Sequence, residues 1–348
     1  MNIKDQVHKE NYTIYCADNM EVLPQLADES VDLSVYSPPF AGSAGGLFTY
    51  SSDPRDMSNC SSREQFMTQY EFIVEQMARV TKAGRINAIH CMDICDSFGY
   101  LYDFPHDIIE LHKKYGFDYR SRVTVWKEPL KVRMRTMVTS LMHKFIMEDS
   151  TRCFPATPDY ILIFSRKGEC KVPVTHKGGL TEYAGEIPIL PHMTKAWNNQ
   201  NNTNFTDDEL WEHLKNTHVD GEISKLNHYI WQRYASSVWD DIRIDNVVPF
   251  RESKDEDDER HIHPLQLDVI ERLVDLYSNP EEIILSPFMG VSSEVYGAIK
   301  RGRKGIGVEL KESYYRQAVL NMLEVERIVR ESSEQISFDD IGYKERIE

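Results

Sequence analysis

The sequence predicts an α/β protein with a mainly parallel, Rossmann-like sheet and an inserted region. Strand-like and helix-like segments alternate over the first third of the chain. The alternation breaks between about residues 170 and 245, and it returns after residue 263. Strands that alternate with helices form parallel sheets, because each parallel crossover needs a long connection, usually a helix.

The first half of the chain is expected to hold most of the sheet. Residues 63–81 carry apolar side chains at helical spacing and end at Lys82-Ala83-Gly84, which predicts a helix with a glycine stop. Short apolar runs predict strands, and the runs at 119–126 and 159–165 are candidates for pairing with each other. The expected strands are residues 12–17, 31–36, 85–91, 119–126 and 159–165, with a helical turn or two at 20–26 and a helix near 107–115.

The middle of the chain has prolines, glycines and an Asn-rich run at 197–204, and only 207–214 keeps a helical period. Residues 252–259 are highly charged and are typical of a solvated linker. After them we expect helices at 265–277, 293–300 and 312–328 and strands at 282–285 and 305–310. These patterns predict two sheet-forming parts, 1–170 and 246–330, an insert at 171–245, and a loosely ordered acidic tail at 331–348.

Composition narrows the class of protein. The chain has 348 residues, 41% of them hydrophobic, so it has enough apolar material for a core. No apolar run approaches the roughly 20 residues of a membrane helix, and the first residues do not resemble a signal peptide. Six scattered cysteines without a CxxC pair predict no disulfides. His90, Cys91 and Cys95 lack a matching second pair of ligands, so no metal is expected.

The charge is distributed unevenly. The net charge of −16 argues against a nucleic-acid binder, which usually has a basic surface. Between residues 120 and 152, however, the sequence contains eight basic residues and only three acidic ones. A local basic patch matters more to DNA than the net charge does.

Two turns carry the chemistry. The first, Ser37-Pro38-Pro39-Phe40, follows the apolar strand at 31–36. Two prolines fix the backbone and remove amide donors, which leaves carbonyl oxygens beside a hydroxyl and an aromatic ring. This combination suits a planar ring with an exocyclic amine, although a stiff turn without a ligand fits the same residues.

The second turn is the segment 284–295, ILSPFMGVSSEV, which runs from strand to helix. Gly290 allows a ligand to approach the backbone, and Glu309, nineteen residues later, is placed to bind ribose hydroxyls. The absence of GxGxxG disfavours a pyrophosphate. A nucleoside without phosphates, such as S-adenosylmethionine (SAM), fits better.

These segments resemble the DNA amino-methyltransferases that modify adenine N6 or cytosine N4. SPPF is similar to their (D/N/S)-P-P-(Y/F/W) motif, and SPFMG is similar to their DPFxG cofactor motif. The catalytic motif comes first here, with the insert between the two. This is the circularly permuted order of the family's beta class, and the chain also resembles stand-alone phage and prophage methylases.

The resemblance implies a role for each matching residue. Ser37 and Pro38 would bind the target amine, beside Pro39, and Phe40 would stack on the flipped base. The residues that match the family's cofactor-binding positions would hold SAM. They are Asp18, Pro264, Gln266, Ser286, Pro287, Phe288, Gly290, Ser292 and Glu309.

Two positions depart from the family pattern. The usual Asp of DPF is Ser286, and the second glycine of the motif is Ser292. Loss of the carboxylate removes a partner for the cofactor's amino group. Glu294 could replace it, but a solvated helix residue is the simpler expectation.

The resemblance implies duplex DNA as the partner, in the cytoplasm of a bacterial or phage-infected cell. The insert would read base edges through polar and aromatic side chains that include Tyr234, whereas Trp231 and Trp239 are expected to belong to its small core. The residues expected to contact DNA are Lys127, Lys131, Arg133, Arg135, Gln232 and Arg233. The sequence leaves open adenine or cytosine as the target, a homodimer, and a separate restriction endonuclease. It also leaves open an RNA amino-methyltransferase and a non-catalytic DNA-binding protein on the same fold.

Overall fold

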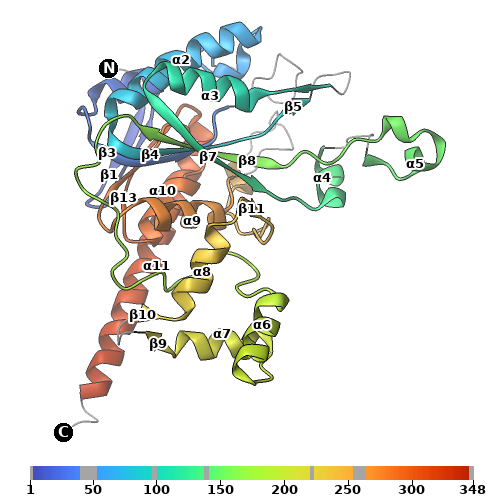
Figure 1. Ribbon diagram of the computed structural model, residues 1–348. Coiled ribbons are helices and arrows are strands. Elements are labelled where there is room, and N and C mark those ends of the chain that lie inside the picture. Colours follow the sequence, from blue (N-terminus) through green and yellow to red (C-terminus); the bar gives the residue numbers. More distant parts are fainter. Residues whose placement is uncertain are drawn as a thin grey trace.

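A nine-stranded mixed sheet forms the centre of the molecule (Figure 1). The computed structural model describes residues 3–39, 53–95, 100–136, 141–219, 223–253 and 264–344. In sheet order the strands are β1 (Asp5–His8), β2 (Tyr12–Cys16), β13 (Lys304–Glu309), β12 (Ile283–Ser286), β3 (Val31–Tyr36), β4 (Thr81–Cys91), β8 (Asp159–Arg166), β7 (Phe117–Val125) and β11 (Val238–Trp239).

The five strands from β2 to β4 are parallel, as the alternation of strands and helices predicts. The β7–β8 pair is antiparallel, and β8 is antiparallel to β4. The carboxyl ends of β2, β13, β12, β3, β4 and β7 and the start of β8 therefore lie at one edge of the sheet, which we call the carboxyl edge.

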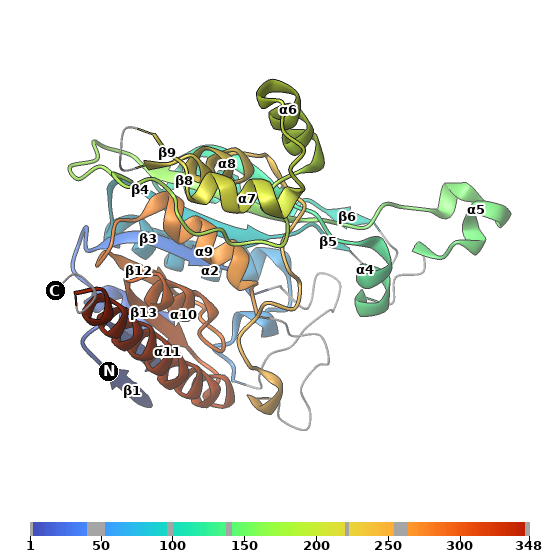
Figure 2. The same ribbon diagram turned by 90° about the horizontal axis from the view of Figure 1, so that it is seen from below.

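Helices cover both faces of the sheet. One face packs on α2 (Arg63–Val80) and α3 (Phe104–Lys114) through Phe66, Tyr70 and Ile108. The other packs on α9 (Leu267–Tyr277), α10 (Ser293–Lys300) and α11 (Glu312–Lys344). Figure 2 shows α9, α10 and α11 across this second face. Residue 331 is thus not the start of a loosely ordered tail, because α11 continues as helix to Lys344.

Two further parts extend from this three-layer core. The β7–β8 connection carries α4 (Pro129–Thr136) and α5 (Lys144–Glu148) and projects away from the sheet in both views (Figures 1 and 2). The insert contains α6 (Pro191–Asn201), α7 (Asp207–Lys215) and α8 (Leu226–Tyr234), which share a separate small core around Leu210, Leu214 and Ile230.

The insert differs in detail from the expectation. Tyr234 belongs to its small core, but Trp239 lies in β11 of the central sheet and packs in the main core. Trp231 is 53% exposed and stacks on His228, so it is not a core residue. Among the described helices, none is both long enough and apolar enough to span a lipid bilayer.

Candidate active site

The two motif turns lie side by side at the carboxyl edge. β3 and β12 are hydrogen-bonded neighbours, with Leu285 opposite Ser34. The turn that begins at Ser37 therefore emerges beside the turn that begins at Pro287. The rings of Tyr36 and Phe288 lie 5.9 Å apart, which joins the two turns directly. Phe40 lies outside the described residues.

Ser37 begins a line of polar side chains from neighbouring strands. Its Oγ lies 2.5 Å from Nδ1 of His90, near the end of β4. His90 Nε2 lies 2.9 Å from Oδ2 of Asp159, the first residue of β8. The same carboxylate oxygen lies 2.5 Å from Nζ of Lys127, just after β7. Sequence reasoning missed His90 and Asp159 as partners of Ser37, because only the strand order brings them together.

Burial and charge act in opposite directions on Asp159. Burial alone would raise its pKa, but the nearby charges of Lys127 and His90, together with their polar contacts, outweigh it and hold the pKa well below its usual range. Asp159 is therefore a carboxylate. Lys127 is a correction to the sequence-based expectation. Its side chain is only 13% exposed and pairs with Asp159 instead of extending toward a phosphate.

The turn after β12 is built around an open space at Gly290. Gly290 has φ +53°, and a Cβ added there would meet no atom within 4 Å. Its amide donates to Glu309 Oε2 at 3.0 Å, and the Lys311 amide donates to Oε1 at 2.8 Å. Burial of the carboxyl raises the pKa of Glu309 to about 7, and the charge of Asp56 adds to this effect.

Glu294 is buried in the first turn of α10, which contradicts the expectation of a solvated side chain. Burial raises the pKa of Glu294 to about 8; its own backbone amide and the nearby Ser286 hydroxyl oppose this shift, and the charge of Glu309 adds to it. Ser286, which stands where the family usually has Asp, thus lies close to the carboxyl group of Glu294. The buried Ser286 hydroxyl forms no aligned hydrogen bond with any described residue. Phe288 packs toward the core on the α2 side of the sheet, with its ring 6.4 Å from that of Tyr70.

Ser292 occupies the family's second glycine position in a left-handed conformation, with φ +75°. Only glycine adopts this conformation without steric cost, which explains the family preference. The Ser292 hydroxyl donates to Sδ of Met322 at 3.2 Å and is fully buried. Its side chain therefore points into the protein core.

The end of β2 also contacts this turn. Asp18 caps α1 (Asn19–Val22) by accepting a hydrogen bond from the Met20 amide at 2.8 Å. Asn19, a residue that sequence reasoning missed, donates to the Pro287 carbonyl at 2.5 Å. Pro264 is partly exposed, and Gln266 is buried immediately before α9.

The residues expected to contact DNA fall into three groups. Lys131 and Arg133 lie on α4, exposed and half-buried respectively, and neither pairs with a carboxylate within the ranges that the structure describes. Arg135 is in the same helix, but its side chain is not among those described. Gln232 is half-buried, with its Nε2 3.0 Å from Nε2 of His228.

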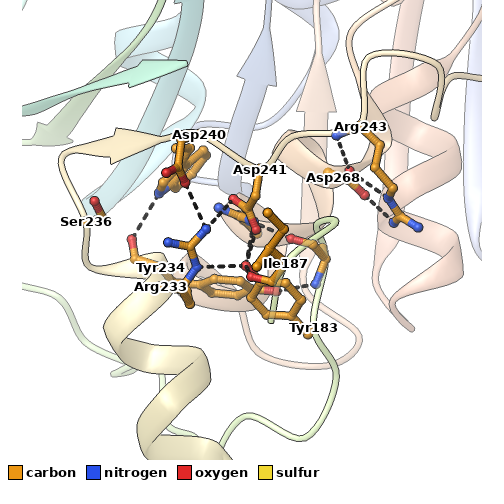
Figure 3. A network of polar contacts seen from close by, with 12 residues as sticks. Tyr183, Ile187, Arg233, Tyr234, Ser236, Asp240, Asp241, Arg243 and Asp268 are labelled. Carbon is orange, nitrogen blue, oxygen red and sulfur yellow. Dashed lines mark hydrogen bonds and ion pairs between the residues drawn. The ribbon is translucent and has the colours of Figure 1, made fainter. Parts of the chain in front are cut away.

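Arg233 is a second correction. It is 5% exposed, and its guanidinium pairs with Asp240 at 2.8 Å and Asp241 at 3.2 Å (Figure 3). These pairs leave it unavailable to DNA. Its position beside aromatic residues in the sequence suggested a DNA contact, but the side chain is buried.

Both motif turns lie at the carboxyl edge, which is where α/β proteins of this class bind their ligands. Residues 31–320 match the family model described as DNA methylase. The chain therefore belongs to the DNA methylase family, as its motifs predict.

Individual relatives agree with this assignment. A segment of 67 residues is 42% identical to the type II methyltransferase M1.MboII of Moraxella bovis, covering 19% of this chain and 26% of that protein. The matched segments span only 26–33% of the curated relatives' own lengths.

Solved structures show that the fold extends over nearly the whole chain. TTHA0409 of Thermus thermophilus, provisionally described as a DNA modification methylase and solved with SAM, gives a TM-score of 0.55 at 20% identity over 90% of this chain and 96% of that one. The cytosine-N4-specific PvuII DNA methyltransferase gives 0.53 at 13% identity over 92% of this chain and 90% of that one. The predicted α/β fold is confirmed. The circular permutation stays a prediction.

Proposed function

We propose that the protein transfers a methyl group from SAM to the exocyclic amine of a flipped base in duplex DNA, at adenine N6 or cytosine N4. The observation that carries this proposal is the adjacency of the two turns after β3 and β12 at the carboxyl edge. A base inside a duplex cannot reach such an edge, so the target must leave the helix.

The chain offers a suitable place for the cofactor. Open space lies beside Gly290, and the buried Oδ1 of Asn19, next to Pro287, has no hydrogen-bond partner among the described residues. The carboxyl groups of Glu294 and Glu309 lie near this turn, and SAM carries a positively charged sulfonium and an ammonium group. SAM would be held by these residues together with Asp18, Gln266 and Phe288.

When bound, SAM supplies an electrophilic methyl group. The role of the chain is mainly to position the amine for in-line attack. Ser37 and the Pro38 carbonyl would accept hydrogen bonds from the amine and direct its lone pair, and Phe40 would stack on the base. Most of the catalytic effect comes from this orientation, without a covalent intermediate.

DNA would be held from two sides. Lys131, Arg133 and Arg135 of α4 would contact phosphates, since α4 follows β7 directly at the carboxyl edge. The insert at 171–245 would read base edges, with Gln232 among its polar side chains. The site of action would be the cytoplasm, where cellular or phage DNA is available.

Expression in a bacterial host that lacks DNA methylation tests the proposal. Sequencing of the host DNA by a method that detects modified bases should reveal one modified motif, which identifies both the base and the recognition sequence. Ser37→Ala should abolish the modification while the protein stays folded.

The same preparation separates the alternatives. No modified base from folded protein that still binds SAM would favour an RNA substrate. No modification and no SAM binding by calorimetry would favour a non-catalytic DNA-binding protein. The mass of the purified protein in solution reports whether it forms a homodimer, and co-purification reports a companion endonuclease.

A further inference from the structure

The hydroxyl of Ser37 does not stand alone at the carboxyl edge. It is the first member of a line that continues through His90 and Asp159 to Lys127, with contacts of 2.5, 2.9 and 2.5 Å. The side chains of His90, Asp159 and Lys127 are 13%, 4% and 13% exposed. A nearly buried line of this kind fixes the orientation of each member.

The charge on Asp159 decides which nitrogen of His90 carries a proton. Asp159 Oδ2 lies 2.9 Å from Nε2 of His90, within ion-pair distance although the two atoms are not aligned as a hydrogen bond. Because a carboxylate can only accept, this placement favours the tautomer of His90 that carries its hydrogen on Nε2. In a neutral imidazole the other nitrogen, Nδ1, then has a free lone pair. The Ser37 hydroxyl therefore donates to Nδ1, and the lone pairs of its oxygen stay available to the target amine.

We propose that His90, oriented by Asp159, is a positioning residue that holds Ser37 as a hydrogen-bond acceptor and takes up the proton released by methyl transfer. This inference rests on the proposed function. It explains why Ser37, whose hydroxyl could either donate or accept a hydrogen bond, would only accept from the target amine.

The proton route balances. The lone pair of the amine nitrogen forms the new C–N bond, and the electron pair of the broken C–S bond stays on sulfur. The methylated nitrogen carries one extra proton, which passes to Ser37 Oγ as the hydroxyl proton passes to His90 Nδ1. The resulting imidazolium is stabilised by the Asp159 carboxylate.

Among the described residues, Ser37 from the turn after β3 contacts Nδ1 of His90, and Asp159 from β8 lies against Nε2. Lys127, just after β7, pairs with the same oxygen of Asp159. At acidic pH a protonated ring would donate to Ser37 from Nδ1. The serine hydrogen would then turn toward the target amine, and catalysis would be lost.

The test is single-turnover methylation of duplex DNA carrying the recognition motif, measured between pH 5 and 9. His90→Gln should lower the rate constant by about a hundredfold, with SAM affinity by calorimetry and melting temperature near those of the wild type. The wild-type rate should fall on acidification, and the variant should lose this dependence. Asp159→Asn should also slow the reaction.

A double-mutant cycle separates positioning through Ser37 from an independent role. If His90 acts through Ser37, His90→Gln should add nothing to the loss caused by Ser37→Ala. His8→Gln is the matched control, because His8 Nδ1 also contacts a hydroxyl, Thr13 Oγ1 at 2.6 Å, but on the edge strand β1. This cycle does not depend on Asp159→Asn, which could unfold by leaving Lys127 unpaired.

The outcomes are distinct. An active wild type with additive losses from Ser37→Ala and His90→Gln, or with an unchanged pH profile in His90→Gln, overturns this inference and leaves the proposed function intact. A folded wild type that methylates no DNA overturns the proposed function and this inference with it.

Discussion

Glu294 and Glu309 show what burial does to single residues at the turn after β12. Burial raises the pKa of these carboxyl groups to about 8 and about 7. Glu309 accepts a hydrogen bond from the amide of Gly290, and its charge also raises the pKa of Glu294. A cation that entered the open space at Gly290 would favour their ionised forms. The departure of Ser286 from the family's Asp is thus accompanied by a carboxyl group supplied from α10.

This arrangement predicts that SAM binding at pH 7 releases protons, because the cation lowers the raised pKa of Glu294. Calorimetry in buffers of different ionisation enthalpy measures the number released. Glu294→Gln should release fewer protons and bind SAM more weakly. Glu110→Gln, an exposed change on α3, is the control. Equal proton release by the wild type and Glu294→Gln would argue against a cofactor role for Glu294.

The same shift gives a stability trend with a defined sign. Below its ordinary pKa of 4.5, Glu294 is neutral in the folded and unfolded states alike. Between 4.5 and about 8 the unfolded state ionises first, so the protein without cofactor loses up to about 1.4 kcal/mol per pH unit from this group. Glu294→Gln should therefore have a flatter stability profile over this window.

At the residue scale, the sequence predicts the two turns well because each is local. A proline-rich or glycine-containing turn after an apolar strand is visible in a few consecutive letters. His90, Asp159 and Glu294 are not visible in this way, since their roles depend on strand neighbours and burial. The same reason explains Lys127 and Arg233, whose charges suggest DNA contacts until their buried partners are known.

At the scale of elements, α4 begins four residues after the end of β7 and carries basic side chains at the carboxyl edge. Lys131 and Arg133 lack carboxylate partners among the described residues, whereas Lys127 and Arg233 are paired with buried carboxylates. Basic side chains without acidic partners are the ones free to replace counterions on DNA.

Replacing both Lys131 and Arg133 by alanine should weaken binding to all DNA sequences and reduce the slope of log affinity against log salt by about 2, one for each phosphate contact. Fluorescence anisotropy over a salt titration measures both quantities. Lys304→Ala is the control, because Lys304 pairs with Glu281 at the opposite edge of the sheet. An unchanged slope in the double variant would place α4 outside the DNA interface.

Elements with a clear period are predicted well, and the insert is not. The helix at 293–300 and the strand at 31–36 have the predicted bounds. The Asn-rich run hides α6, which starts at Pro191 and ends where Asn202 adopts a left-handed conformation, with φ +54°. Asparagine is a good residue for such a helix end, so a run that suggests a loop is partly a helix with its stop signal.

At the scale of the whole molecule, one buried arginine joins the insert to the main core. Arg272 of α9 is fully buried and bonds to both carboxylate oxygens of Asp241, at 2.8 and 2.9 Å, and to the Ala184 carbonyl at 2.6 Å. Tyr183, Tyr234 and Trp239 surround its guanidinium. Figure 3 shows Tyr183 and Arg233 directed toward Asp241, with the Arg243–Asp268 pair alongside.

Arg272→Met should destabilise the protein by about 3–5 kcal/mol, because it leaves the buried Asp241 carboxylate with Arg233 as its one remaining cationic partner among the described residues. Chemical denaturation measures the loss, and limited proteolysis should show earlier cleavage within the insert. Arg327→Met is the matched control, since Arg327 pairs with Glu324 and Glu331 on the surface of α11. Equal unfolding midpoints for the two variants would contradict a structural role for Arg272.

The pairing of β11 with β7 bears on the distance along DNA between the bases that the insert would read and the base that would be modified. Backbone amides of Thr124 and Trp126 donate to the carbonyls of Ser237 and Trp239, both at 2.9 Å, so the return strand of the insert is part of the central sheet. These hydrogen bonds would have to break for the insert to move as a separate arm. For an insert that reads DNA, the number of base pairs between the bases read and the base modified would then be set by the fold.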